Sequence, residues 1–193
     1  ERMRIDTSGN VGIGTTSVIG KFHANDSGGA TVTLTRTSGA TSGNLGKLRF
    51  GNTNVDSDLA SIVAIQDGAT NNSAITFGTQ TAGAAVAERL RIDSKGMLAL
   101  GTTPPTDSHS TWSQFFIGQK GSVISERLGS GGLFGTYVTD NLYVDNDTGN
   151  FAYRVANEAS AYLQEAATHR WYTVASGSTG AAATLSEKMR IDS

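Results

Sequence analysis

The chain repeats one motif at long spacing. It reads E-R-M-R-I-D-T-S-G-N-V-G-I-G-T-T over residues 1–16 and E-R-L-R-I-D-S-K-G-M-L-A-L-G-T-T over residues 88–103. A shortened copy, E-K-M-R-I-D-S, occupies residues 187–193. Self-similarity at long spacing is typical of architectures that are assembled from stacked units. We therefore expect these 193 residues to be a slice of a longer modular chain, starting inside one copy of the motif and stopping inside another.

Each copy of the motif predicts a short β-hairpin with one apolar face. Apolar and charged residues alternate in its first half, and apolar residues alternate with glycine or alanine in its second half, as in half-buried strands. Gly9 and its counterpart Gly96 suit a hairpin loop that needs a positive φ. The apolar face is predicted to contain Met3, Ile5, Val11 and Ile13 in the first copy, Leu90, Ile92, Leu98 and Leu100 in the second, and Met189 and Ile191 in the third.

The opposite face of the hairpin carries Gly12, Gly14, Ala99 and Gly101. Small residues inside a strand often mark a place where another backbone approaches closely. Two interpretations follow from this pattern. Either these residues form a turn or bulge without a partner, or they pack tightly against copies of the same chain around an axis.

The composition indicates a thin hydrophobic core. Glycine, serine and threonine make up about a third of the chain, whereas leucine, isoleucine, valine and phenylalanine make up about a fifth. A net charge of only −2 and the many alternating segments argue against disorder. Burial between identical chains compensates for a thin core and covers exposed strand edges. We therefore expect the chain to associate with copies of itself.

Several classes of function are excluded or disfavoured. The absence of cysteine excludes disulfides, thiolate zinc sites and a cysteine nucleophile. Lysine and arginine are scattered and balanced by acidic residues, which argues against a nucleic-acid partner. The apolar runs are too short for membrane insertion.

The chain is predicted to be all-β, with modules between the motif copies. We divide it into a repeat hairpin (1–16), a Gly/Thr/Ser-rich β module (17–87), a second repeat hairpin (88–103), an aromatic-rich β module (104–186) and the start of a third repeat (187–193). Residues 156–168 are rich in alanine and glutamate and suit either a helix or a strand; the neighbouring strands favour a strand. Asp140 and Asn141 are predicted to form a two-residue turn between strands.

The motif resembles the repeat of tail-fibre and tailspike proteins of tailed bacteriophages. The resemblance covers about a fifth of the chain and is carried by Arg-x-Arg-Ile-Asp, then Ser or Thr, a glycine turn and Val-Gly-Ile-Gly-Thr-Thr. In that family the repeat commonly lies upstream of an intramolecular chaperone domain that cleaves itself off. No protease residues are carried over, because this chain contains no such domain.

The resemblance implies an elongated, intertwined homotrimeric fibre on a virion, assembled in the host cytoplasm. The motif residues would then form the core between the three chains. The implied partners are two further copies, adjoining fibre segments, and a host surface glycan or outer-membrane protein.

No residue pattern points to catalysis, a cofactor or a metal. His23, His109 and His169 are far apart and lack acidic partners at a suitable spacing. The pair Glu158 and Glu165 lacks a glycosidase context. Residues 145–156 lack the oxygen ligand, glycine and glutamate of an EF-hand loop at the required positions, and residues 12–14 lack the third glycine of a dinucleotide loop.

The aromatic residues of the second module are the candidates for contact with a receptor. Their flat apolar faces and polar tips suit stacking on sugar rings or docking on a protein. The alternative is that they form the core and the seam between chains. The candidates are Trp112, Tyr137, Tyr143, Tyr153, Tyr162, Trp171 and Tyr172.

The sequence thus favours a structural and adhesive segment of a phage tail fibre, without enzymatic activity. One alternative is a shaft segment of a tailspike whose glycan-cleaving domain lies outside these residues. The other is a bacterial surface adhesin that uses the same repeat.

Overall fold

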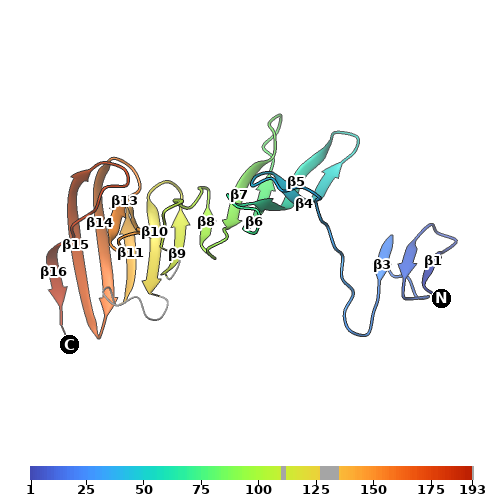
Figure 1. Cartoon of the computed structure of the whole chain (residues 1–193), viewed down its shortest axis with the longest axis horizontal. Helices are drawn as coiled ribbons and strands as arrows, with labels where there is room; N and C mark the ends of the chain where they lie inside the picture. Colours follow the sequence, from blue (N-terminus) through green and yellow to red (C-terminus); the bar gives the residue numbers. More distant parts are fainter. Residues whose placement is uncertain (110–111, 127–134, 193) are drawn as a thin grey trace. The chain divides into compact units, whose positions relative to one another are not determined.

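The computed structural model describes residues 1–109, 112–126 and 135–192. These residues form β-strands joined by turns and loops, with no helix among them, which confirms the all-β prediction (Figure 1). The chain divides into two compact units, Glu1–Thr35 and Arg36–Ser193.

The first unit contains a three-stranded sheet. Strands β1 (Met3–Ile5) and β2 (Val11–Ile13) form an antiparallel hairpin, and β3 (Phe22–Ala24) runs parallel to β2. The hairpin turn is held by Asp6, whose Oδ1 accepts the backbone N–H groups of Ser8 and Asn10 at 2.9 Å each.

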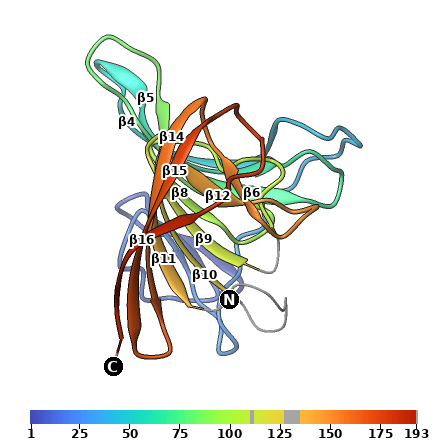
Figure 2. The same cartoon turned by 90° about the vertical axis from the view of Figure 1, so that its left-hand side faces the viewer.

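The second unit contains a long sheet of eleven strands and a small sheet of two (Figures 1 and 2). Neighbours in the long sheet are antiparallel except β8 and β9, which are parallel. The small sheet pairs β12 (Leu142–Val144) with β13 (Phe151–Tyr153). In spatial order the long sheet contains β16 (Ser186–Ile191), β15 (Thr168–Gly177), β14 (Asn157–Glu165), β11 (Thr136–Asp140), β10 (Gly121–Glu126), β9 (Trp112–Ile117), β8 (Leu98–Leu100), β7 (Ala87–Ile92), β6 (Ser73–Thr79), β5 (Asp56–Gln66) and β4 (Asn44–Asn52).

The two complete motif copies fold in the same way, which confirms the hairpin prediction. Met3 pairs with Ile13 in the first copy, and Leu90 pairs with Leu100 at the same register in the second. In each copy a parallel strand follows, β3 beside β2 and β9 beside β8. The structural repeat is therefore longer than the sequence motif, because it includes a third strand whose sequence is not repeated.

The third copy forms β16 and shares a β-bulge with the second copy. In β7 the bulge lies at Arg89, between the residues paired with Phe77 and Gly78. In β16 it lies at Lys188, at the same place in the motif. A bulge inserts one residue into a strand and shifts which side chains share a face.

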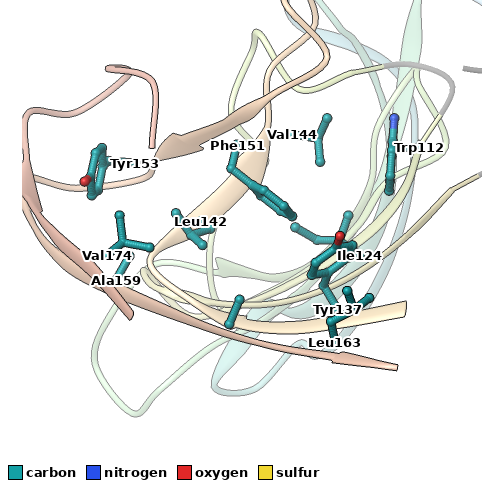
Figure 3. Close-up of a cluster of buried hydrophobic side chains, with 11 residues drawn as sticks. Trp112, Ile124, Tyr137, Leu142, Val144, Phe151, Tyr153, Ala159, Leu163 and Val174 are labelled. Carbon is teal, nitrogen blue, oxygen red and sulfur yellow. The ribbon is translucent and has the colours of Figure 1, made fainter. Parts of the chain in front are cut away.

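The main core lies between the long sheet and the small sheet. Figure 3 shows Phe151 of the small sheet pointing toward Tyr137 and Ile124 of the long sheet. The Tyr137 and Phe151 rings meet edge to face, with their centroids 4.9 Å apart. The small sheet therefore supplies the apolar layer that covers one face of the long-sheet strands β9, β10, β11, β14 and β15. The cluster contains Trp112, Ile124, Tyr137, Leu142, Val144, Phe151, Tyr153, Ala159, Ala161, Leu163 and Val174.

The ambiguous segment at residues 156–168 is β-structure, as favoured from the sequence, but it contains a hairpin turn that was not predicted. Strands β14 and β15 pair from Glu165 and Thr168 outward. Ala166 and Ala167 form the turn with φ values of 44° and 63°. Positive φ at both central residues matches the right-handed twist of a two-residue hairpin.

The turn predicted at Asp140 and Asn141 is wrong, because β11 and β12 are not partners. Asn141 instead turns the chain from the long sheet into the small one, with a φ of 64°. Its side chain is fully buried, and its Oδ1 accepts the Val155 N–H at 2.8 Å. Its Nδ2 donates to the carbonyl oxygens of Val155 and Glu158 at 3.0 and 2.9 Å.

We expect Asn141→Leu to lower the free energy of unfolding by about 3 kcal/mol. The substitution leaves the partly buried Val155 N–H without its acceptor and places a bulky side chain at a positive φ. Urea denaturation followed by tryptophan fluorescence measures the change. Asn71→Leu, in an exposed loop, is the control. Equal stability of both variants would contradict the assigned role of Asn141.

Candidate functional site

The apolar residues of the motif lie on a face that their own chain leaves uncovered. In the first unit, Met3 and Ile5 are 60 % and 66 % exposed. In the second unit, Ile92, Leu100 and Met189 are 42 %, 46 % and 50 % exposed. We call the face of the long sheet that carries Ile92, Leu100 and Met189 the outer face. The face that the small sheet covers is the inner face.

Strand register aligns large apolar residues of the outer face into two rows. The residues of each row are direct cross-strand partners, so no polar side chain interrupts them. The first row is Leu48, Ile62, Phe77, Leu90, Leu100 and Ile117. The second row is Ile75, Ile92, Leu98, Phe115, Val123, Val138, Tyr162, Trp171 and Met189.

The outer face is unusual for an antiparallel sheet. Such a sheet commonly buries its apolar side chains on one face and presents polar side chains to water on the other. Here the outer face is apolar although the chain already buries an apolar core on the inner face, and the chain itself leaves the outer face uncovered. Burying a large aliphatic side chain is worth about 1.5–3 kcal/mol relative to leaving it exposed. Covering the outer face would therefore release a substantial free energy.

The small residues of the motif are covered by their own chain. A Cβ atom at Gly12 would lie 2.7 Å from Cγ2 of Val18 and 2.9 Å from the Thr15 oxygen. Ala99 is fully buried in a cluster with Phe116. Close approach is thus confirmed at Gly12 and Ala99, but the expectation that copies of the chain approach there is wrong. The residues that follow each hairpin fill the space instead.

Gly101 matches the first interpretation, a turn or bulge without a partner. It has a φ of 67°, and a Cβ atom there would meet nothing within 4 Å. It is a turn residue without a close neighbour. The glycines of the motif therefore serve two different purposes, close packing at Gly12 and backbone conformation at Gly101.

A glutamate and an arginine form an ion pair in each copy of the motif. The bonds from Arg4 Nε to Glu1 and from Arg91 Nε to Glu88 measure 2.8 Å. The third copy repeats the pair, with Arg190 Nε 3.0 Å from Glu187. In a regular strand, residues three apart face opposite ways. The bulge between them in the second and third copies brings both side chains to the inner side.

Arg91 is the most buried of these arginines and links the hairpin to the β5–β6 loop. Its side chain is 12 % exposed, and Nη1 lies 3.4 Å from Oδ1 of Asp67. Burial alone would raise the pKa of Asp67, but hydrogen bonds from Ser94 and the charges of Arg91 and Lys95 outweigh it and lower that pKa. The hydrogen bond to Glu88 in turn raises the pKa of Arg91.

Four of the seven aromatic candidates for receptor contact are buried. Trp112, Tyr137 and Tyr153 lie in the main core of Figure 3. Tyr143 is buried in the second cluster, beside Phe116. These four side chains therefore serve the alternative role that the sequence left open, the core of the module.

The other three aromatic candidates remain partly exposed. Tyr172 packs against the main core from β15. Tyr162 and Trp171 are cross-strand partners on the outer face, with ring centroids 5.1 Å apart. The hydroxyl of Tyr162 also bonds Nδ1 of His169. Tyr162 and Trp171 thus belong to the second apolar row, and each also carries a polar group at the end of its side chain.

The described ranges, 1–109, 112–126 and 135–192, contain no group of three histidine, aspartate or glutamate side chains that could hold a metal ion. Within the same ranges no helix is long and apolar enough to cross a membrane. We therefore take the uncovered outer face as the candidate functional site.

Comparison with protein-family models gives no match, and comparison with the curated proteins gives no significant match. The function of the chain is therefore inferred from its motif and from the two faces of its long sheet.

We expect Arg91→Met to lower the free energy of unfolding of the second unit by about 1–3 kcal/mol. The partly buried carboxylates of Glu88 and Asp67 would lose their charged donor. Arg89→Met is the matched control, because Arg89 is exposed and bonds only hydroxyl groups, and its effect should stay within about 0.5 kcal/mol. Chemical denaturation measures the unfolding free energy of both variants. Similar losses in the two would contradict the larger contribution that we assign to Arg91.

The lowered pKa of Asp67 predicts a loss of stability in acid. A carboxyl group whose pKa is lower in the folded state stabilises the fold above its unfolded pKa of about 3.9, and this contribution is lost as the pH falls through the folded value. Asp67→Asn should therefore be less stable than the original chain near neutral pH and lose less stability on acidification. Parallel stability curves between about pH 7 and about pH 2 would disprove this.

Proposed function

We propose that this chain is a structural segment of a bacteriophage tail fibre that works as a homotrimer and supports attachment to the host cell. The observation that carries the proposal is the uncovered apolar outer face, to which the second and third copies of the tail-fibre-like motif contribute, and the first copy exposes apolar residues at the same motif positions in its own unit. In this proposal the chain is non-enzymatic and is displayed on the virion after assembly in the host cytoplasm.

Copies of the same chain are the partners that best suit the outer face. The two rows are apolar from β4 to β16, so a covering surface must be apolar over the same length. In a trimer with closed rotational symmetry, the outer faces of the three chains meet that requirement by packing together around the common axis. The thin core of each chain is then supplemented by burial between chains.

The motif residues have a direct role in this arrangement. Met3, Ile5, Val11 and Ile13 in the first unit repeat the pairing of Leu90, Ile92, Leu98 and Leu100 in the second. Each hairpin would place four apolar side chains in the seam between chains, and Met189 and Ile191 would add two more. The buried inner face, with its ion pairs, would hold each chain together.

Contact with the host would fall to surfaces that the seam leaves free. Host partners in this proposal are a surface glycan or an outer-membrane protein, and adjoining fibre segments would cover the ends of the assembly. Tyr162 and Trp171 lie in the second row, so we assign them to the seam before any receptor contact.

The test of the proposal is the mass of the chain in solution. Sedimentation equilibrium should give three times the 20.1 kDa of one chain. A stable monomer at micromolar concentration, with the outer face accessible to an apolar dye, would refute the trimer. Display on a virion requires a separate experiment, labelling of purified phage particles with an antibody raised against this chain.

We expect Ile92→Asp to abolish assembly while leaving the separate chain folded. Ile92 is 42 % exposed in one chain, so the change should cost the isolated chain only about 1 kcal/mol. In a buried seam the new carboxylate would lack a partner, and association should weaken by about a hundredfold or more. Sedimentation gives the assembly state, and circular dichroism gives the fold.

The matched control is Thr70→Asp, which adds the same charge at an exposed position in the β5–β6 loop. It should remain trimeric. If Ile92→Asp assembles as the control does, with unchanged melting, the outer face is not the seam.

A further inference from the structure

A cavity of about 390 Å³, lined by apolar and polar residues, opens beside the small sheet, on the inner side of the long sheet. The segment after β8, the β9–β10 turn and the chain after β13 form its walls. Among its lining residues are Thr102, Asp107, Gln119, Tyr143, Arg154 and Thr179. All of them belong to the second unit, so the cavity is complete within one chain.

Arg154 is the charged donor of this cavity. Its guanidinium lies over the Phe116 ring, 4.6 Å from the centroid. It donates to the Gly121 oxygen at 2.9 Å and to Oγ1 of Thr102 at 3.4 Å. No carboxylate of the described residues lies within ion-pair distance, in contrast to Arg91. These neutral contacts hold the guanidinium in place without neutralising it.

The position of Arg154 favours an anionic ligand. Burial lowers its pKa to about 10, so the group is still charged at neutral pH. A guanidinium has five N–H donors in a planar fork, and two of them are used by Gly121 and Thr102. A partly buried charge is stabilised by a counter-charge, and the fork matches a carboxylate or phosphate.

The other lining groups favour a ligand that also carries hydroxyl groups. Thr102, Thr179 and Gln119 offer donors and acceptors of neutral hydrogen bonds. Oδ2 of Asp107 accepts the Tyr143 hydroxyl at 2.6 Å, which places a carboxylate acceptor among the lining groups. The volume falls in the range of small-molecule sites and accommodates one sugar ring.

We propose that this cavity binds an acidic sugar, with Arg154 pairing with its carboxylate or phosphate and Asp107 accepting its hydroxyl groups. The inference goes beyond the fibre proposal and does not depend on it, because one chain supplies every lining residue. The cavity lies on the inner side, so covering the outer face leaves it in place.

Isothermal titration with three probes tests the proposal: glucuronate, glucose 6-phosphate and glucose. At least one of the two anions should bind saturably, about tenfold or more tightly than glucose. Comparison of glucuronate with glucose 6-phosphate identifies the preferred oxyanion. Absence of saturable binding of either anion at millimolar concentration overturns the proposal, as does equal binding of glucose.

Substitution of Arg154 assigns the binding to this cavity. Arg154→Met should weaken anion binding about tenfold or more, and Arg154→Lys should weaken it less, because it keeps the charge and loses the fork. Arg49→Met, an exposed arginine on β4, removes the same charge and should bind as the original chain does. Unchanged affinity in a folded Arg154→Met overturns the proposal.

The thermal unfolding of each variant shows whether it is folded. If Arg154→Met does not fold, Arg154→Lys decides, since unchanged affinity in that variant also overturns the proposal. Sedimentation of the same samples separates the two proposals. A trimer that binds no acidic sugar refutes only the cavity, and a monomer that binds one refutes only the fibre assembly.

Discussion

Cross-strand register is the constraint on which the rest of the structure depends. Because side chains alternate between faces, one shift of register would exchange the outer and inner residues of a strand. The motif secures the register twice, through the hairpin pairing of Leu90 with Leu100 and through the bulge at Arg89. The bulge also turns Glu88 and Arg91 to the same side, where they pair. One short sequence thus supplies apolar residues to the outer face and an ion pair to the inner face.

Local patterns predicted the parts of the fold that depend on neighbours in sequence. Both motif hairpins followed from alternation and turn residues, and β-structure around residues 156–168 followed from the neighbouring strands. The prediction was wrong where the chain leaves one strand pair for the next. Alternation cannot show that Val18 covers Gly12, or that Asn141 leads into a separate sheet. Those outcomes depend on the path of the connecting segments, which the alternation of residues does not encode.

The residues of the candidate sites were likewise only partly predictable from the sequence. The motif supplied Ile92 and Leu100 of the outer face, but Leu48, Phe77 and Ile117 were missed as parts of it. Their own alternation was a usable signal once the strand order was known. Arg154 had no such signal, because its lack of a carboxylate partner is a property of the folded chain.

The two faces of the long sheet divide stability between different kinds of contact. The inner face combines the aromatic core with buried polar groups, and each of these needs a partner within the chain. The outer face is apolar, and hydrophobic contacts do not depend on direction as hydrogen bonds do. It therefore suits association, in which matching surfaces need only exclude water. A cavity that contains a charged guanidinium is compatible with the inner side alone, because the same charge in the apolar seam would oppose assembly. The position of Arg154 beside the small sheet keeps ligand recognition and self-association from competing for the same surface.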